Sequence, residues 1–225
     1  MAPKDYESSL PPVPSSDFDP GASSSSSSSR RAQADVEALA VANDCPFCHI
    51  ASVFPPYDPT DPPAYSSPLL QPERTAPQQP ATFLILSTAH LVGFLDIMPL
   101  SAGHVLLCPR AHRPKLTDVT PAEAAELGRY LRVLSAAVAA ATGVADWNVV
   151  QNNGAAAAQV VPHMHFHVIP RPELRGRRSE RFTATMFGRG QRDELDEDEA
   201  VVLAEKIRRA VAEIVRKDEE GSAKL

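Results

Sequence analysis

The sequence is poor in cysteine, has no excess of positive charge and contains no long apolar run. Only three of its 225 residues are cysteine, too few for a disulfide framework and typical of a reducing compartment. A net charge of −6 argues against the basic surface that binds nucleic acid. No apolar stretch could span a bilayer, and the acidic, Pro/Ser-rich N-terminus lacks signal-peptide features. We therefore expect a soluble protein of the cytoplasm or nucleus.

Low-complexity stretches divide the chain. Residues 1–34 include an unbroken serine run and few large apolar groups, so we expect a disordered tail. Residues 35–172 would form the main domain, beginning with a short helix over residues 35–43. Within it, the Pro-rich residues 54–80 predict an irregular surface insertion, because proline cannot join a central strand. Residues 173–225 would hold an Arg-rich loop and a C-terminal helix.

The middle of the chain predicts an α+β domain with an antiparallel sheet of about five strands. Thr120-Pro121-Ala122-Glu123 combines an N-cap hydroxyl, a first-turn proline and a capping-box Glu, and Gly143 would end this long helix. Short turns join the strands, which favours an antiparallel over a doubly wound sheet. A second helix is expected from Asp193 to about Lys217. The expected strands are Thr82–Leu86, Leu91–Asp96, His104–Cys108, Trp147–Gln151 and a strand with three histidines.

That histidine strand is the most informative stretch. His163, His165 and His167 alternate with Met164 and Phe166, so a strand would place all three imidazoles on one face. A strand selected only for stability would carry Thr, Tyr or Val there. An artificial tag would sit at a terminus and would not be interleaved with core residues. Two interpretations remain open: the imidazoles bind a metal, or one is a nucleophile and the others assist it.

Two of the three cysteines form the motif Cys45-Pro-Phe-Cys48. This spacing suits a tetrahedral zinc site, although a redox pair has the same spacing. No second C-x-x-C motif follows, so the remaining ligands of a zinc would have to be histidines.

These motifs, in this order, resemble the histidine triad family. The three alternating histidines resemble its signature, and Cys45-Pro-Phe-Cys48 resembles its N-terminal knuckle. Residues 94–112 resemble its central hairpin. Asn152-Asn-Gly154, followed by Gln159, resembles its phosphate loop. The resemblance covers about residues 45–172 without the Pro-rich insertion, and it implies the fold of that family.

The resemblance also implies chemistry: nucleotidyl transfer or hydrolysis at an α-phosphate, without a metal in the reaction. His165 would attack phosphorus and form a nucleotidyl-imidazole, which water then hydrolyses. The backbone carbonyl of His163 would hold the tautomer of His165. His167 would contact the phosphate oxygens and protonate the leaving group.

Substrate recognition carries over in the same way. The resemblance implies a purine nucleotide, with Asp96 accepting hydrogen bonds from the ribose hydroxyls. Asn152 and Gln159 would serve the phosphate. Val160 departs from the pattern, because the family usually has Ser or Thr there, and Ala158 replaces a frequent glycine. The apolar residues that would form the base pocket are Phe47, Phe94, Ile97 and Leu106.

Some members of the family also hold a structural zinc. The matching residues here would be Cys45, Cys48, His104 and His163, whereas His112, His49 and His90 would lie on the surface or in loops. Family members usually form homodimers through the long helix and neighbouring strands, so we expect a homodimer.

Three functions therefore stay open. The favoured one is an enzyme that cleaves adenosine phosphoramidates or dinucleoside polyphosphates, with Asp96-Ile97 and Asn152 pointing to the phosphoramidase-like branch. The second is a nucleotide-binding regulatory protein with little turnover, suggested by Val160. The third is a metalloenzyme that uses the three triad histidines as zinc ligands.

Overall fold

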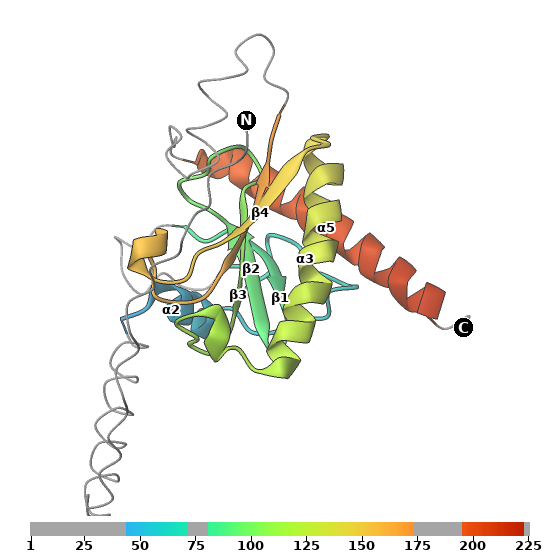
Figure 1. Cartoon of the computed structure of the whole chain (residues 1–225). Coiled ribbons are helices and arrows are strands. Elements are labelled where there is room, and N and C mark those ends of the chain that lie inside the picture. Colours follow the sequence, from blue (N-terminus) through green and yellow to red (C-terminus); the bar gives the residue numbers. More distant parts are fainter. Residues whose placement is uncertain (1–43, 72–80, 173–194, 223–225) are drawn as a thin grey trace, which may run out of the picture. The chain divides into compact units, whose positions relative to one another are not determined.

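Five short strands form one antiparallel sheet, as the sequence predicts. The computed structural model describes residues 44–71, 81–172 and 195–222. The strand order is β1-β2-β3-β5-β4, so the last two strands in the chain exchange places in the sheet (Figure 1). The strands are β1 (Leu84–Ser87), β2 (Leu91–Leu95), β3 (Val105–Pro109), β4 (Trp147–Gln151) and β5 (Phe166–Pro170).

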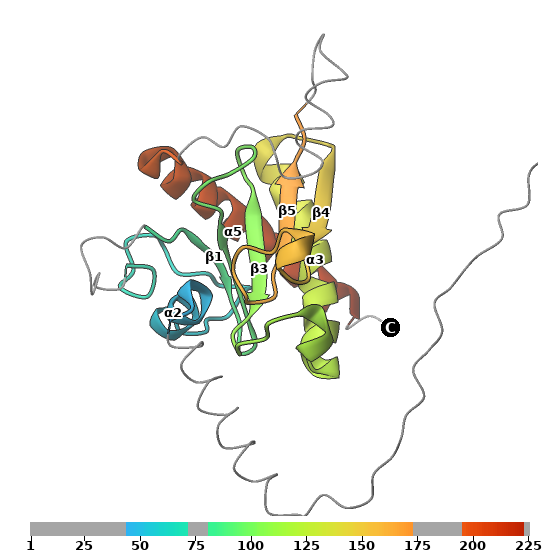
Figure 2. The same ribbon diagram turned by 60° about the vertical axis from the view of Figure 1, so that its left-hand side comes forward.

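Side-chain alternation along the strands gives the sheet two different faces. Leu91 and Leu95 of β2, with Val105 and Leu107 of β3, point into the large core beneath helices α3 (Pro121–Thr142) and α5 (Glu197–Ser222). Even-numbered residues of the same strands point the other way and pack against helix α2 (Pro46–Val53). Figure 2 shows α2 apart from α3 and α5, with the sheet between them. The apolar core and the face that carries the site are therefore separate.

Helix α3 begins and ends where its sequence predicts. The Thr120 hydroxyl accepts a hydrogen bond from the Glu123 amide, and the Glu123 carboxylate accepts one from the Thr120 amide. Gly143 ends the helix in the left-handed conformation, with φ of 70°. Helix α5 runs from Glu197 to Ser222, and so ends later than the predicted Lys217. It is packed on the same core as the sheet.

The motif Cys45-Pro-Phe-Cys48 begins a helix that the sequence analysis does not predict. Pro46 occupies the first turn of α2, where a missing amide hydrogen costs nothing. The Arg110 guanidinium then fastens the C-terminal end of α2 to the sheet. It donates to the carbonyls of Ala51 and Phe54 and to the Thr88 carbonyl near the end of β1. This attachment places α2 beside the end of β3.

The described part of the Pro-rich insertion, residues 54–71, holds no helix or strand, as predicted, but it is not only a surface loop. Phe54 and Leu70 are buried against Leu84 of β1. The Tyr57 hydroxyl donates to the Ile85 carbonyl, and the Tyr57 amide donates to the Ser87 carbonyl. Residues 54–71 therefore cover the outer edge of β1.

The prediction of one continuous histidine strand is wrong in part. Strand β5 begins at Phe166, so His167 is in the strand while His163 and His165 precede it. The Met164 amide donates to the carbonyl of Arg113 instead of to a strand ladder, and the His163 amide donates to Val161. The chain therefore turns before it enters the sheet, and His163 and His165 point to different partners.

Several predictions concern residues outside the described part of the chain. These are the disordered tail 1–34, the helix over residues 35–43, residues 72–80 of the insertion and residues 173–192 of the Arg-rich loop. Among the helices that the structure describes, none has the length and apolar character needed to cross a membrane.

Gly103 offers a test of the turn that positions the site. Its φ is +83°, and a Cβ there would lie 2.7 Å from Cγ2 of Thr142. We expect Gly103→Ala to lower the free energy of unfolding by about 1–3 kcal/mol. The matched control is Gly128→Ala on an exposed turn of α3, where nothing lies within 4 Å. That change should add about 0.5–1 kcal/mol of stability. Urea denaturation of both variants measures the difference, and equal stabilities would contradict the strain at Gly103.

Candidate active site

The site lies on the α2 face of the sheet, where β2, β3 and β5 contribute neighbouring side chains. Phe94 of β2 and Leu106 of β3 are paired across the ladder, and Leu106 is paired with His167 of β5. His163 and His165 lie just before β5 and complete the triad. The rings of His165 and His167 are 4.8 Å apart between centroids.

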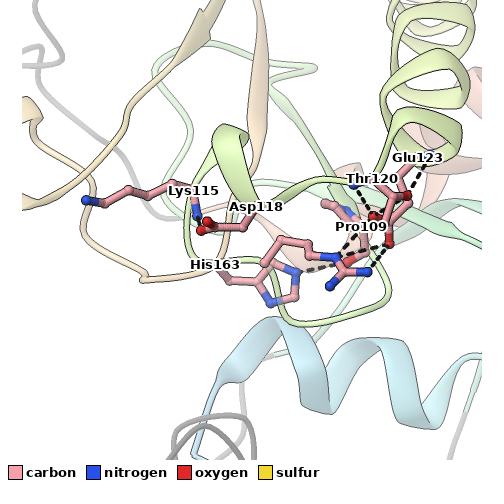
Figure 3. A network of polar contacts seen from close by, with 7 residues as sticks. Pro109, Lys115, Asp118, Thr120, Glu123 and His163 are labelled. Atoms are coloured by element: carbon pink, nitrogen blue, oxygen red, sulfur yellow. Dashed lines mark hydrogen bonds and ion pairs between the residues drawn. The ribbon is translucent and has the colours of Figure 1, made fainter. Parts of the chain in front are cut away.

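His163 is fully buried and its two ring nitrogens have different roles. Nε2 lies 2.9 Å from the Pro109 carbonyl oxygen, which can only accept, so Nε2 carries the hydrogen (Figure 3). The lone pair of Nδ1 therefore faces the Sγ atoms of Cys45 and Cys48, at 3.4 and 3.5 Å. Burial lowers the pKa of His163 to about 4, which keeps the imidazole neutral.

His112 completes a group of four potential metal ligands. Its Nδ1 lies 3.3 Å from Cys48 Sγ, and its Nε2 is buried with no hydrogen-bond partner among the described residues. The ligand atoms of Cys45, Cys48, His112 and His163 all lie within 4.8 Å of one another. From the sequence we expect His112 on the surface or in a loop and not among the metal ligands, so this candidate ligand was missed.

The predicted fourth ligand, His104, belongs elsewhere, and this assignment is corrected. His104 precedes β3, whereas Arg110 anchors α2 and its cysteines near the other end of that strand. Five residues of extended strand separate the two ends by about 16 Å. The fourth ligand of a metal held by the two cysteines must therefore come from the residues after β3, where His112 lies.

The four residues fit a tetrahedral zinc by their distances and donor types. Zinc bound to thiolate and imidazole separates sulfur from nitrogen by about 3.6 Å, close to the 3.3–3.5 Å found here. Burial and the neighbouring Cys45 raise the pKa of Cys48 to about 12, because two adjacent thiolates repel each other. A bound dication would remove that penalty and stabilise the thiolates. The donated hydrogen bond to Pro109 also orients the His163 ring for metal binding.

His165 has the geometry of a nucleophile. Its Nδ1 lies 2.6 Å from the carbonyl oxygen of His163, so Nδ1 carries the hydrogen and Nε2 keeps its lone pair. This is the contact that the family resemblance implies. Burial lowers the pKa of His165, so the ring is neutral near pH 7.

His167 is oriented by a chain of polar groups that the sequence did not predict. His104 Nε2 lies 2.9 Å from His167 Nδ1. His104 Nδ1 accepts from the Leu100 amide at 3.2 Å and lies 3.3 Å from Asp96 Oδ2. A neutral ring that accepts from Leu100, or an imidazolium beside Asp96, carries a hydrogen on Nε2 in both cases. His104 therefore donates to His167 Nδ1, which leaves the hydrogen of His167 on Nε2.

The three triad imidazoles do not converge on one metal. In the described part of the chain, His163 groups with the cysteines and His167 groups with Asp96 and His104, while His165 belongs to neither group. This arrangement does not support the interpretation in which the three triad histidines hold a catalytic zinc.

The predicted base-pocket residues are largely brought together. Phe47 of α2 contacts Phe94 edge-on, with ring centroids 5.3 Å apart, and contacts His165 at 5.1 Å. Leu106 lies in the same apolar cluster. Ile97 is 41% exposed and is not among the described residues packed in this cluster; it directly follows the buried Asp96 in the chain. The Asp96 Oδ1 atom accepts from the Met98 amide, so part of this carboxylate is already occupied by the turn after β2.

The loop between β4 and the triad is held closed by its own amide side chain. Gln159 accepts from the Gly154 amide at 2.6 Å and donates to the Pro114 carbonyl at 2.8 Å. Both ends of its side chain are therefore used to hold the loop. Asn152 is half-buried at the start of the loop, and Val160 is 91% exposed.

Comparisons with known proteins identify the family of the domain that holds this site. A profile of the HIT domain matches residues 77–174. An adenosine 5'-monophosphoramidase from Schizosaccharomyces pombe is 38% identical over 88 residues, which cover 39% of this chain and 63% of that protein. An uncharacterized HIT-like protein from Methanocaldococcus jannaschii is 32% identical over 114 residues, which cover 51% of this chain and 83% of that protein.

A solved structure extends the similarity to the fold. The zinc-bound histidine triad family protein from Mycobacterium smegmatis is 25% identical, with a TM-score of 0.51, and the match covers 78% of this chain and 99% of that one. The chain spans less than two thirds of the length of several curated relatives, the yeast phosphoramidase among them.

Proposed function

This chain belongs to the histidine triad family, and on that basis we propose that it is a nucleotide hydrolase or transferase acting at an α-phosphate. The substrates would be adenosine phosphoramidates or dinucleoside polyphosphates. One observation carries the proposal: the hydrogen bond from His165 Nδ1 to the His163 carbonyl leaves a neutral Nε2 lone pair beside His167. The name of the yeast relative supports the phosphoramidate class.

In the first step, His165 Nε2 attacks the α-phosphorus and forms an N–P bond, while the bond from phosphorus to the leaving group breaks. His167 Nε2 gives its hydrogen to the leaving nitrogen or oxygen, and His167 Nδ1 takes the Nε2 hydrogen of His104. His104 enters this step as the imidazolium paired with Asp96 and leaves it as a neutral ring, so His167 also stays neutral. In the second step, water attacks phosphorus, the N–P bond breaks and AMP is released. The water's proton goes to His167 Nε2, the Nδ1 hydrogen of His167 returns to His104 Nε2, and the rings regain their starting protonation.

The neighbours of the triad keep these roles distinct. The His104 hydrogen bond keeps a hydrogen on Nε2 of His167, where the leaving group needs it. Phe47 packs edge-on against the rings of His163 and His165 and would shield one side of His165 from water. The adenine would enter beside Phe94 and Leu106, with Ile97 at the opening.

The covalent intermediate is directly testable. We expect brief mixing with an adenosine phosphoramidate to add one AMP to the protein at His165, and the adduct to accumulate in His167→Ala. His165→Ala should lose turnover by about 10⁴-fold, because the nucleophile is gone, and should keep its affinity for AMP. Intact-protein mass spectrometry and peptide mapping measure the adduct. Full turnover in His165→Ala would overturn the mechanism.

A second function is favoured by one observation. Val160 is almost fully exposed at the position where the family commonly supplies a hydroxyl. A regulatory protein that binds AMP with little turnover would fit this change. AMP binding without adduct or product in the same experiment would select it, and a gain of turnover in Val160→Ser would identify the cause.

A structural zinc on Cys45, Cys48, His112 and His163 is also part of the proposal. The distances and donor types support it, as does the zinc-bound relative of similar fold. Four protein ligands would close the coordination shell, so the ion would stabilise the structure without entering the reaction. It would fix the Nδ1 side of His163, whose carbonyl holds His165.

The corrected ligand set predicts opposite results for two histidines. We expect one zinc per chain in the wild type, less than about 0.1 in His112→Ala, and nearly full occupancy in His104→Ala. His104→Ala should instead lose turnover, because His167 loses the donor that sets its tautomer. Inductively coupled plasma mass spectrometry measures the metal. Loss of zinc in His104→Ala with retention in His112→Ala would restore the ligand set predicted from sequence.

We propose, further, that the chain forms a homodimer through the free edge of β4. In the described sheet, β4 is paired only with β5. Trp147 and Val149 project from the same face of this edge strand and are 41% and 45% exposed. A second copy would bury these apolar groups and satisfy the open edge.

Sedimentation velocity tests the dimer. The double variant Trp147→Lys/Val149→Lys should sediment as a monomer at micromolar concentration. In a dimer, the two lysines of each copy would be buried next to those of the other copy. Val202→Lys is the matched control, since Val202 is 66% exposed on α5. A wild-type protein that sediments as a monomer would contradict the proposal.

A further inference from the structure

The segment after β3 runs beside the loop that leads into the triad. The Met164 amide donates to the Arg113 carbonyl, Gln159 donates to the Pro114 carbonyl, and the Leu116 amide donates to Asn153 Oδ1, at 2.5, 2.8 and 2.9 Å. These three bonds connect residues 113–116 to both ends of the loop. The segment is therefore fixed relative to the site.

The two cations of this segment have different surroundings. Arg113 forms a two-point ion pair with Glu123, at 3.1 Å from each guanidinium nitrogen to its nearest oxygen. Lys115 uses its backbone amide to bind Asp118, but its ammonium has no hydrogen-bond or ion-pair partner among the described residues. Figure 3 shows the Lys115 side chain extended away from Asp118 and Glu123.

The Lys115 ammonium lies over the loop at Gly154. A Cβ at Gly154 would lie 3.7 Å from Cε and 3.9 Å from Nζ of Lys115. Residues 154–160 carry no charged or hydroxyl side chain, and the amide of Gln159 is already bonded to backbone. Lys115 therefore supplies the positive charge that this stretch lacks.

Lys115 follows, by two residues, the backbone contact that lies next to the nucleophile. The Arg113 carbonyl is bonded to Met164, the residue that directly precedes the nucleophile His165. Two residues of extended chain span at most about 7 Å, and the lysine side chain adds its own length. Lys115 therefore lies on the segment that contacts both the loop and the residue before the nucleophile.

We propose that Lys115 binds a negatively charged leaving group, so that the protein prefers substrates whose leaving group carries a negative charge. The ligand class is a phosphoryl group attached to the α-phosphate, such as the ADP portion of a dinucleoside triphosphate. This inference rests on the proposed function and names its substrate class. The lysine charge stands in for the hydroxyl absent at Val160, and a cation favours a phosphate over a neutral amine.

Two substrates with the same AMP half separate this effect from general catalysis. One is diadenosine triphosphate, which releases ADP, and the other is an adenosine phosphoramidate of an uncharged amine. We expect Lys115→Met to lower kcat/KM about 10-fold for the triphosphate and less than about 2-fold for the phosphoramidate. Lys115→Arg should keep most of the wild-type kcat/KM for the triphosphate. Lys217→Met on α5 should leave kcat/KM unchanged for both substrates. Equal losses for both substrates in Lys115→Met would overturn the proposal.

A binding measurement tests Lys115 even without turnover. ADP carries a β-phosphate at the leaving-group position, and AMP does not. The wild type should bind ADP more tightly than AMP, and Lys115→Met should lose that preference while its affinity for AMP and its melting temperature are unchanged. If the wild type cleaves neither substrate, the proposed activity fails and this affinity ratio still decides the role of Lys115. An unchanged ratio in Lys115→Met would overturn the role of Lys115.

Discussion

The arrangement of the site depends on three contacts made by one buried residue. His163 donates from Nε2 to the Pro109 carbonyl at the end of β3, presents Nδ1 to Cys45 and Cys48, and offers its own carbonyl to His165. The first contact fixes the ring, and the ring then determines which nitrogen faces the thiols. The third contact determines which nitrogen of His165 carries a lone pair. His163 thus determines both the geometry of the metal ligands and the tautomer of His165. A change at Cys45 or Cys48 would therefore alter the position of His165, although no metal lies near the substrate.

The period of two along the strands separates stability from chemistry. Side chains on one face of β2 and β3 fill the core under α3 and α5, while those on the opposite face support the site. The site groups sit mainly where the strands begin or end: Asp96 follows β2, His104 precedes β3, and His112 follows β3. A strand end allows a polar group to reach both a buried backbone partner and the open face, which a residue in mid-strand cannot do. The strong helix start at Thr120 and the glycine at 103 hold these ends in place.

Local signals predicted most of the fold, and contacts distant in sequence decided the rest. Short apolar runs between turns located four strands and the capping box located α3, because these signals act within a few residues. The start of β5 depends on the hydrogen bond from the Met164 amide to the carbonyl of Arg113, fifty-one positions earlier, and no local sequence pattern predicts that bond. The exchange of His104 for His112 has the same origin. Both histidines flank β3, and only the docking of α2 by Arg110 shows which end faces the cysteines.

The composition of the triad loop follows from how it is braced. Small residues from Gly154 to Ala158 allow a tight turn, with Gly154 and Ala158 both at positive φ, but they offer a substrate no polar side chain. Gln159 is occupied in closing that turn. Any selection between charged and uncharged substrates must then come from a neighbouring segment that is held in a fixed position against the loop. Residues 113–116 are held in this way by three hydrogen bonds. Registration matters because a charge on a flexible side chain contributes to recognition only when its backbone is held in place. The same segment directly follows a metal-ligand candidate, His112, so the position of the loop is linked to the two cysteines as well.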